Sequence, residues 1–227
     1  MNNWFSRFLT SSLGKKLLMA LTGLFLILFL VVHLSGNLQL LKNDGGRSFN
    51  IYAEFMSTNI LIQTISKLNF TFILLHVLLS LYLTIQNRRA RGSERYAVTS
   101  GKSSIWASRN MGVLGTLVLI FIVVHLRHFY GEMHFGSVPT VNYDGKEVRD
   151  LASVVDYWFS KDWYVALYVF SMGALGFHLW HGFVSAFQTL GLNHPKYNGL
   201  IFFVGKTFSV VVPALFAWIP IAMYFNI

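Results

Sequence analysis

Five of the eight histidines lie inside long apolar runs, where ionisable side chains are rare and usually functional. They are His33, His76, His125, His178 and His181. A lone histidine in such a run is often only a hydrogen-bonded packing residue. Because four different apolar runs each carry a histidine, we expect these histidines to share one role. Binding a metal is a natural candidate, because neutral imidazole is a common metal ligand.

The runs themselves indicate the fold. The 227-residue chain is 54% hydrophobic and only 12% charged, about half the charged fraction of a soluble domain. A helix needs roughly 20 apolar residues to cross a bilayer. We therefore expect one all-α membrane domain over residues 1–227, with a four-helix core and a fifth helix. The five spans are expected at about 17–41, 60–85, 111–130, 163–187 and 200–225.

The charges predict an orientation. One side would hold the N-terminus, the loops 86–110 and 190–199, and Lys206; it carries eleven of the 18 basic residues and one acid, Glu94. The other side carries seven basic and eight acidic residues. Because basic loops remain in the cytoplasm, we expect a cytoplasmic N-terminus and an outer C-terminus. The net charge of +9 therefore reflects loops beside a lipid bilayer and not nucleic-acid binding.

Several kinds of site are excluded. The chain has no cysteine, which rules out thiolate-bound iron–sulfur clusters and thioether-linked cofactors. It also has no glycine-rich phosphate loop, nucleophile elbow or dinucleotide fingerprint. The polar segment 131–161 is expected to cap the outer face, with a turn between short strands at Tyr143–Lys146.

Depth divides four of the histidines into two pairs. His33 and His125 lie 16 and 14 residues from the cytoplasmic ends of their spans, roughly 21–24 Å at helical rise. His76 and His178 each lie 9 residues, roughly 14 Å, from theirs. Two imidazoles at one depth can bind both faces of a haem iron and so make an electron carrier. We expect two haem b groups, an outer one on His33 and His125 and a cytoplasm-side one on His76 and His178.

A weak internal repeat gives the same pairing. The segment LILFLVVHL at 26–34 resembles LVLIFIVVHL at 117–126, with the histidines aligned. Spans one and two would then correspond to spans three and four. Five residues near helix ends are candidates for contacts to haem propionates, although interfacial anchoring explains them as well. They are His181, Arg127, His128, Lys206 and Trp180.

Four segments resemble a known family: VVHLSGNLQL around His33, YAEFMSTN after the first span, VVHLRHFY around His125, and GFHLWHGFVSAFQTLG around His178. Over essentially its whole length the chain resembles the cytochrome b subunit of succinate dehydrogenase or fumarate reductase, in its single-chain, five-helix, di-haem form. In the last segment Gly182 follows His178 by four residues, which favours His178 over His181 as the ligand.

The resemblance implies an electron-transfer subunit that catalyses nothing alone. A flavoprotein (FAD) subunit and an iron–sulfur subunit would dock on the cytoplasmic face of a bacterial cytoplasmic membrane. The basic loop Arg88–Arg109 would suit such docking, although anionic lipid explains it equally well. Electrons would pass between the iron–sulfur clusters and a membrane quinone, by resemblance menaquinone.

Three residues are candidates for the quinone site: Tyr52, Glu54 and Arg127. One position departs from the family pattern. Some relatives carry a carboxylate two residues before the fourth-span ligand, where this chain has Gly176, so that proton pathway is not expected here. Two alternatives stay open: the cytochrome b anchor of a hydrogenase or formate dehydrogenase, and a haem-free transporter whose histidines line a proton path.

Overall fold

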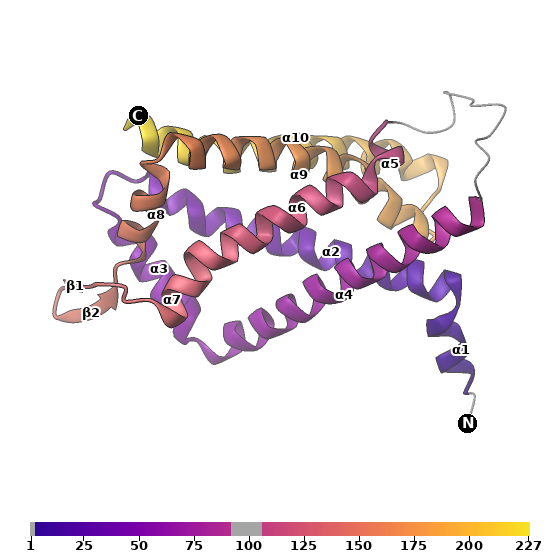
Figure 1. Ribbon diagram of the computed structural model, residues 1–227, viewed down its shortest axis with the longest axis horizontal. Helices are drawn as coiled ribbons and strands as arrows, with labels where there is room; N and C mark the ends of the chain where they lie inside the picture. The colour runs from indigo at the N-terminus through magenta and orange to yellow at the C-terminus, as the bar shows by residue number, and fades with distance from the viewer. Residues whose placement is uncertain (1–2, 92–105) are drawn as a thin grey trace.

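The computed structural model describes residues 3–91 and 106–227. Five of its helical stretches are long and apolar enough to cross a membrane: Ser12–Leu41, Ile60–Ala90, Met111–Phe135, Asp162–Thr189 and Pro195–Phe225. A helix of sufficient length and apolar character is found at each of the five predicted spans, and each helix is longer than the sequence indicated. The chain thus has the architecture of a multi-pass, all-α membrane protein (Figure 1).

The first long helix is preceded by a short one. Helix α1 (Trp4–Thr10) ends at Ser11, whose extended backbone separates it from α2 (Ser12–Asn37). The Ser11 hydroxyl accepts a hydrogen bond from the Gly14 amide at 3.0 Å, which caps α2. A 3₁₀ turn, η1 (Leu38–Leu41), extends α2 at its other end.

Helices α3 (Arg47–Thr58) and α4 (Ile60–Arg91) follow, separated by one residue. Asn59 lies between them, and its side-chain oxygen accepts hydrogen bonds from the amides of Leu61 at 3.0 Å and Ile62 at 3.2 Å. This cap allows α4 to begin immediately after α3. Because α4 continues to Arg91, the first residues of the predicted basic loop are helical; its residues 92–105 lie outside the described ranges.

The third long stretch contains three segments in one continuous helix. Helix α5 (Trp106–Arg109) precedes α6 (Met111–His125), which passes through a π turn, η2 (Leu126–Tyr130), into α7 (Gly131–Phe135). The sequence placed Arg127 and His128 at a helix end. They lie instead inside the π turn, which changes the direction in which the following side chains project.

A hairpin and a short helix come next. Strands β1 (Thr140–Tyr143) and β2 (Lys146–Arg149) pair antiparallel, and Asp144 and Gly145 between them have φ of 54° and 86°. The predicted turn is confirmed, since tight hairpins need such positive φ values. Helix α8 (Leu151–Phe159) follows, capped by the Asp150 carboxylate, which accepts from the Ser153 amide at 3.2 Å.

The last two helices pack along each other. They are α9 (Asp162–Thr189) and α10 (Pro195–Phe225). Two glycines of the pair allow the close approach: a Cβ on Gly205 would lie 2.6 Å from the Phe183 ring, and one on Gly176 would lie 3.1 Å from the Ser209 carbonyl oxygen. Gly176 therefore faces α10.

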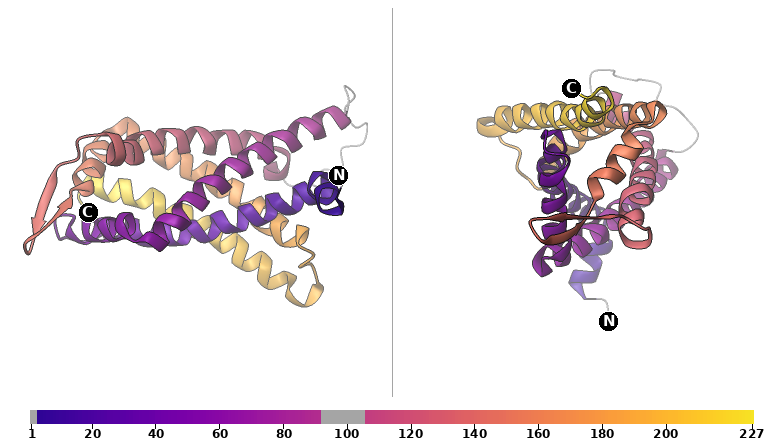
Figure 2. Two further views of the ribbon diagram at one scale, coloured as in Figure 1. Left: turned by 90° about the horizontal axis from the view of Figure 1, so that it is seen from below. Right: turned by 90° about the vertical axis from the view of Figure 1, so that its left-hand side faces the viewer.

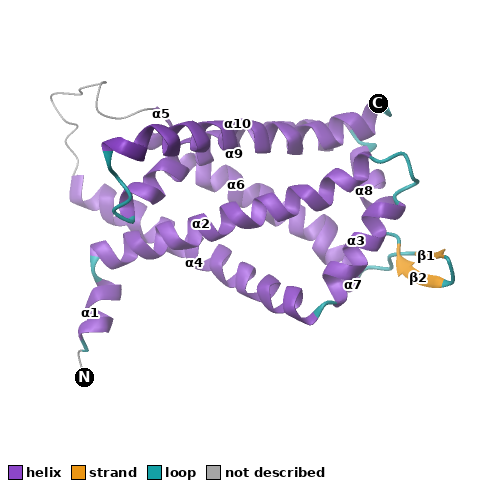
Figure 3. Cartoon of the chain, turned by 180° about the vertical axis from the view of Figure 1, so that it is seen from behind, coloured by secondary structure: helices purple, strands orange, loops and turns teal. Residues whose placement is uncertain are grey.

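The elements outside the long helices gather at opposite ends of the bundle (Figures 1 and 2). Strands β1 and β2, helices α3 and α8, and the C-terminus lie at one end, here called the hairpin end (Figure 3). Helices α1 and α5 lie at the other, the α1 end. The main apolar core lies toward the hairpin end, where Leu34, Phe159, Tyr164, Tyr168 and Ile219 pack together.

Candidate functional site

The interior between α2, α4, α6 and α9 is a cavity of about 1580 Å³, to which α10 adds Phe216, Ile219 and Pro220. Pockets for small ligands usually measure about 300–1,000 Å³. This cavity therefore has room for one very large occupant or for more than one. His33, His76, His125 and His178 all line it, one from each surrounding long helix.

The structure brings these four histidines together as two facing pairs. The ring centres of His33 and His125 are 5.7 Å apart with planes at 89°, and this pair lies toward the hairpin end. The ring centres of His76 and His178 are 6.4 Å apart with planes at 66°, and this pair lies toward the α1 end. We call them the hairpin-end pair and the α1-end pair.

These separations suit imidazoles on opposite sides of one metal ion. A metal–imidazole bond is about 2 Å long, and the ring centre lies roughly 1 Å beyond the nitrogen. Two axial imidazoles would then have ring centres roughly 6 Å apart. Two residues alone do not make a metal site, and residues 3–91 and 106–227 contain no group of three or more His, Cys, Asp or Glu that could hold a bare ion. The pairs fit a metal whose remaining ligands come from a bound organic group.

Two glycines lie against the rings of the α1-end pair in equivalent positions, one against each ring. A Cβ on Gly23 of α2 would lie 3.3 Å from Cε1 of His76 on α4, and one on Gly115 of α6 would lie 3.8 Å from Cε1 of His178 on α9. Each glycine precedes the histidine of its own helix by ten residues. The α2–α4 contact is thus repeated between α6 and α9, which agrees with the predicted sequence repeat.

The Nδ1 atoms of the four rings differ in their partners. Nδ1 of His125 lies 2.7 Å from the hydroxyl of Tyr168, and Nδ1 of His76 lies 3.1 Å from that of Thr22. Nδ1 of His33 has only a long contact of 3.4 Å to the Asn37 amide, which donates mainly to the His33 carbonyl at 2.7 Å. When Nδ1 is hydrogen-bonded, Nε2 is the ring nitrogen left for a metal.

His178 has no such partner. Its Nδ1 is buried and makes no hydrogen bond to any residue in the described ranges. Orphaned buried nitrogens of this kind are rare in folded proteins, because each costs about 1–3 kcal/mol. Tyr168 and Thr22 were not among the sequence-based candidates. Nothing in the sequence marks them, since their contacts depend on how α9 and α2 are rotated against their neighbours.

The predicted propionate candidates separate into one residue that lines the cavity and four that do not. His181 lines it, one helical turn after His178. Trp180 and Lys206 contact each other outside it, with the Lys206 Nζ 5.6 Å from the indole centre. Arg127 is 68% exposed and pairs with Glu132 at 2.8 Å.

His128 also packs outside the cavity. Its Nδ1 lies 3.0 Å from the Tyr164 hydroxyl, and its ring stacks on Trp158 with centres 3.7 Å apart. His128 therefore packs between α8 and α9, and its ring is not available to a group inside the bundle.

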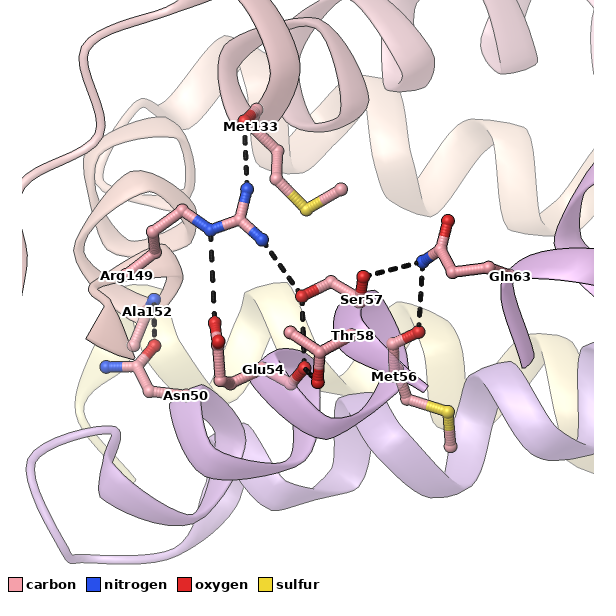
Figure 4. Close-up of polar contacts among 9 residues, drawn as sticks. All are labelled: Asn50, Glu54, Met56, Ser57, Thr58, Gln63, Met133, Arg149 and Ala152. Atoms are coloured by element: carbon pink, nitrogen blue, oxygen red, sulfur yellow. Dashed lines mark hydrogen bonds and ion pairs between the residues drawn. The ribbon is translucent and has the colours of Figure 1, made fainter. Parts of the chain in front are cut away.

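Of the three quinone candidates, Tyr52 lines the cavity, whereas Glu54 and Arg127 do not. Tyr52 lines the cavity against Gly36, where a Cβ would lie 2.3 Å from the tyrosine ring. Glu54 lies outside the cavity lining and faces Arg149 at 4.0 Å (Figure 4). Arg149 also donates to the Ser57 hydroxyl at 2.9 Å and the Met133 carbonyl at 3.2 Å, and so ties β2 to α3 and α7. Nothing in the sequence marked Arg149 for this role.

Comparison with known proteins adds no assignment: no family model, no curated protein and no solved structure matches the chain.

Proposed function

We propose that the chain is a di-haem membrane cytochrome b that carries electrons across the bilayer. The observation that supports this most directly is the presence of two facing histidine pairs inside one large intramembrane cavity. On this proposal His33 and His125 bind the outer haem b, and His76 and His178 bind the cytoplasm-side haem b. The hairpin end is then the outer end of the bundle.

Bound haem would supply reversible one-electron chemistry. The chain would hold the haem in place and shield it from water. The four long helices hold each pair of imidazoles at the separation of axial ligands. With Nδ1 of His125 and His76 protonated, the hydroxyls of Tyr168 and Thr22 would accept from these two rings, fix their orientation and leave Nε2 for the haem iron. The two imidazoles of each pair would occupy both remaining ligand positions of a haem iron, and the mostly apolar lining would limit the access of water.

A bare metal site and a proton path suit the cavity less well. The two pairs offer only two ligands each, and among the described lining residues no carboxylate is present to complete a metal site or to relay protons. A macrocycle supplies the four missing ligands itself. This favours a haem protein over a haem-free transporter.

We propose further that the chain is the membrane anchor of a succinate dehydrogenase or fumarate reductase complex in a bacterial cytoplasmic membrane. The support is the resemblance of the segments around His33, His125 and His178 to that family. The partners would be a flavoprotein and an iron–sulfur subunit at the cytoplasmic α1 end, where Arg88 and Arg89 extend α4. The second substrate would be a membrane quinone, by resemblance menaquinone, with Tyr52 the one candidate that lines the cavity.

Purification of the chain from membranes with whatever binds it tests both levels of the proposal. We expect two haems b per chain by the pyridine haemochrome assay, together with a flavoprotein and an iron–sulfur protein that oxidise succinate or reduce fumarate. Two haems with a hydrogenase or formate dehydrogenase partner would reject the complex but keep the cytochrome. No dithionite-reduced b-type absorbance would reject the cytochrome itself.

A further inference from the structure

Two histidines of the third long stretch contact two tyrosines of α9. Nδ1 of His125 lies 2.7 Å from the Tyr168 hydroxyl, and Nδ1 of His128 lies 3.0 Å from the Tyr164 hydroxyl. The histidines are three residues apart and the tyrosines four, so the two contacts are neighbours along the helices. Tyr164 and Tyr168 also contact each other through their hydroxyls. The four polar groups form one line, here called the His125–His128 chain.

The His125–His128 chain passes through the wall of the cavity. His125 and Tyr168 line the cavity, whereas Tyr164 and His128 lie outside its lining. Tyr164 is fully buried and Tyr168 is 6% exposed, and both belong to the main apolar core. A hydroxyl in such a core is costly unless it is hydrogen-bonded, and phenylalanine would fill the same space without that requirement. Two hydroxyls at these positions therefore indicate that the connection itself has a role.

The π turn places His128 at the far end of this chain. In a regular α-helix, residues three apart lie on the same face, so His128 would face the cavity together with His125. The π turn that begins at Leu126 changes the direction of the side chains after it. His128 packs flat on Trp158 of α8 instead, with ring centres 3.7 Å apart and planes at 17°. Such π turns occur frequently at functional sites, and this one directs a histidine away from the cavity and onto α8.

The hydrogens available in the chain fix the direction of its bonds. A neutral imidazole has one donor and one acceptor nitrogen, and a hydroxyl donates once and also accepts. When Nε2 of His125 binds a metal, its Nδ1 carries the hydrogen and donates to Tyr168. Tyr168 can then donate to Tyr164, and Tyr164 to Nδ1 of His128. His128 is therefore the terminal acceptor, and its own hydrogen lies on Nε2.

We propose that His128 is a positioning residue for the outer haem, which it influences through Tyr164, Tyr168 and the ligand His125. This inference rests on the proposed function, and it gives His128 a role other than the propionate contact expected from the sequence. Hydrogen bonds in a line polarise one another, so an acceptor at the far end strengthens the bond from His125 to Tyr168. A stronger bond makes the imidazole a better donor to ferric iron. It also holds the His125 ring close to perpendicular to that of His33, at 89°.

The test uses the purified, haem-loaded protein and the variant His128→Phe, which can still stack on Trp158 but has no nitrogen to accept from Tyr164. The outer haem is measured alone in the His178→Ala background, and the α1-end haem alone in the His33→Ala background. The midpoint potential of the outer haem should rise by roughly 10–30% of its rise in Tyr168→Phe. Its ferric electron paramagnetic resonance signal should shift as well, because the g values depend on the angle between the axial imidazole planes. The α1-end haem should keep both its potential and its signal.

Three further variants separate the hydrogen bond from the packing. His128→Asn loses the aromatic stack but places a side-chain oxygen near the position of Nδ1, so it should restore the wild-type potential. His194→Phe makes the same replacement at an exposed histidine between α9 and α10, outside the cavity lining, and should have no effect. His128→Phe combined with Tyr168→Phe should shift the potential no further than Tyr168→Phe alone, because both changes act through one bond.

Each other outcome overturns the inference. An unchanged potential and signal in His128→Phe, or equal changes at the two haems, would exclude this role of His128 while leaving the proposed function intact. A shift in His128→Asn as large as that in His128→Phe would assign the effect to packing on Trp158. Nitrogen chemical shifts of ¹⁵N-labelled histidine that place the His128 hydrogen on Nδ1 would contradict the direction of the chain. A wild-type protein without haem would reject the proposed function and this inference with it.

Discussion

The hairpin-end pair and the α1-end pair are built from the same four helices but are supported differently. At the hairpin end, Nδ1 of His125 lies 2.7 Å from the buried Tyr168 hydroxyl, and the rings of Phe29, Phe121 and Phe129 surround the pair. At the α1 end, glycines lie beside both rings, and Nδ1 of His178 has no hydrogen-bond partner among residues 3–91 and 106–227. Each pair has one ring held by a short contact of Nδ1, His125 by Tyr168 and His76 by Thr22, but the aromatic rings add support only at the hairpin end. The α1-end pair, and His178 above all, depends more on what binds between its rings.

The largest expected effect is at His178, whose Nδ1 has no hydrogen-bond partner within the described ranges. His178→Ala should remove the α1-end haem entirely and halve the haem content, because no neighbouring side chain takes its place opposite His76. The matched control is His181→Ala, one turn away on the same helix and also lining the cavity. Haem per chain by pyridine haemochrome decides between them. Two haems in His178→Ala together with loss in His181→Ala would reverse the ligand assignment.

Crowding the α1-end pair should have a smaller effect of the same kind. Gly115→Leu would press a side chain against His178, and Gly23→Leu would do so against His76, because even a Cβ approaches those rings to 3.8 and 3.3 Å. Overpacking of this size costs about 1–3 kcal/mol, so we expect roughly ten-fold weaker haem binding at the α1-end pair only.

Gly173→Leu is the matched control for crowding, since nothing lies within 4 Å of a Cβ at that position of α9. Haem content after a fixed dilution, read separately for each haem in redox difference spectra, measures the effect. Equal losses at the two pairs would show that the glycines serve the packing of the whole bundle and not the α1-end pair.

Loss of the hydrogen bond at the hairpin-end pair should change the midpoint potential of its haem more than the amount of haem bound. Tyr168→Phe removes the acceptor of His125 Nδ1–H, which makes the imidazole a weaker donor to ferric iron. We expect the midpoint potential of the outer haem to rise by roughly 40 mV, the equivalent of about 1 kcal/mol for one electron. Tyr157→Phe is the control, because Tyr157 is exposed on α8 and lies outside the cavity lining.

The sequence was sufficient for the features that follow from hydropathy and spacing. The five spans, the depth match within each pair and the Tyr143–Lys146 turn are all local or one-dimensional properties. The closeness of His33 to His125 and of His76 to His178 follows from equal depth once four helices surround one cavity. Helix lengths were underestimated because helices such as α4 continue beyond the bilayer, where apolar composition no longer marks them.

Contacts that depend on helix rotation could not be predicted. Tyr168 meets His125, and Thr22 meets His76, only because of the angles at which their helices pack. The sequence placed Arg127 and His128 near the end of a helix expected to be regular, from which they could reach a group in the cavity. The π turn at 126–130 breaks that regularity, and both side chains lie outside the cavity lining.

The smallest expected effect is at Thr22, because its hydroxyl is already hydrogen-bonded within its own helix. Thr22 donates to the Leu18 carbonyl at 2.8 Å, so toward His76 Nδ1 at 3.1 Å it can only accept. This contact is longer than the one between Tyr168 and His125, and we expect Thr22→Val to raise the potential of the α1-end haem by less than Tyr168→Phe raises that of the outer haem. Redox titration of both variants measures the difference, with Thr71→Val as the control, because Thr71 of α4 lies outside the cavity lining and donates to the Lys67 carbonyl at 3.0 Å. A larger shift in Thr22→Val would show that the α1-end pair is the more strongly oriented of the two.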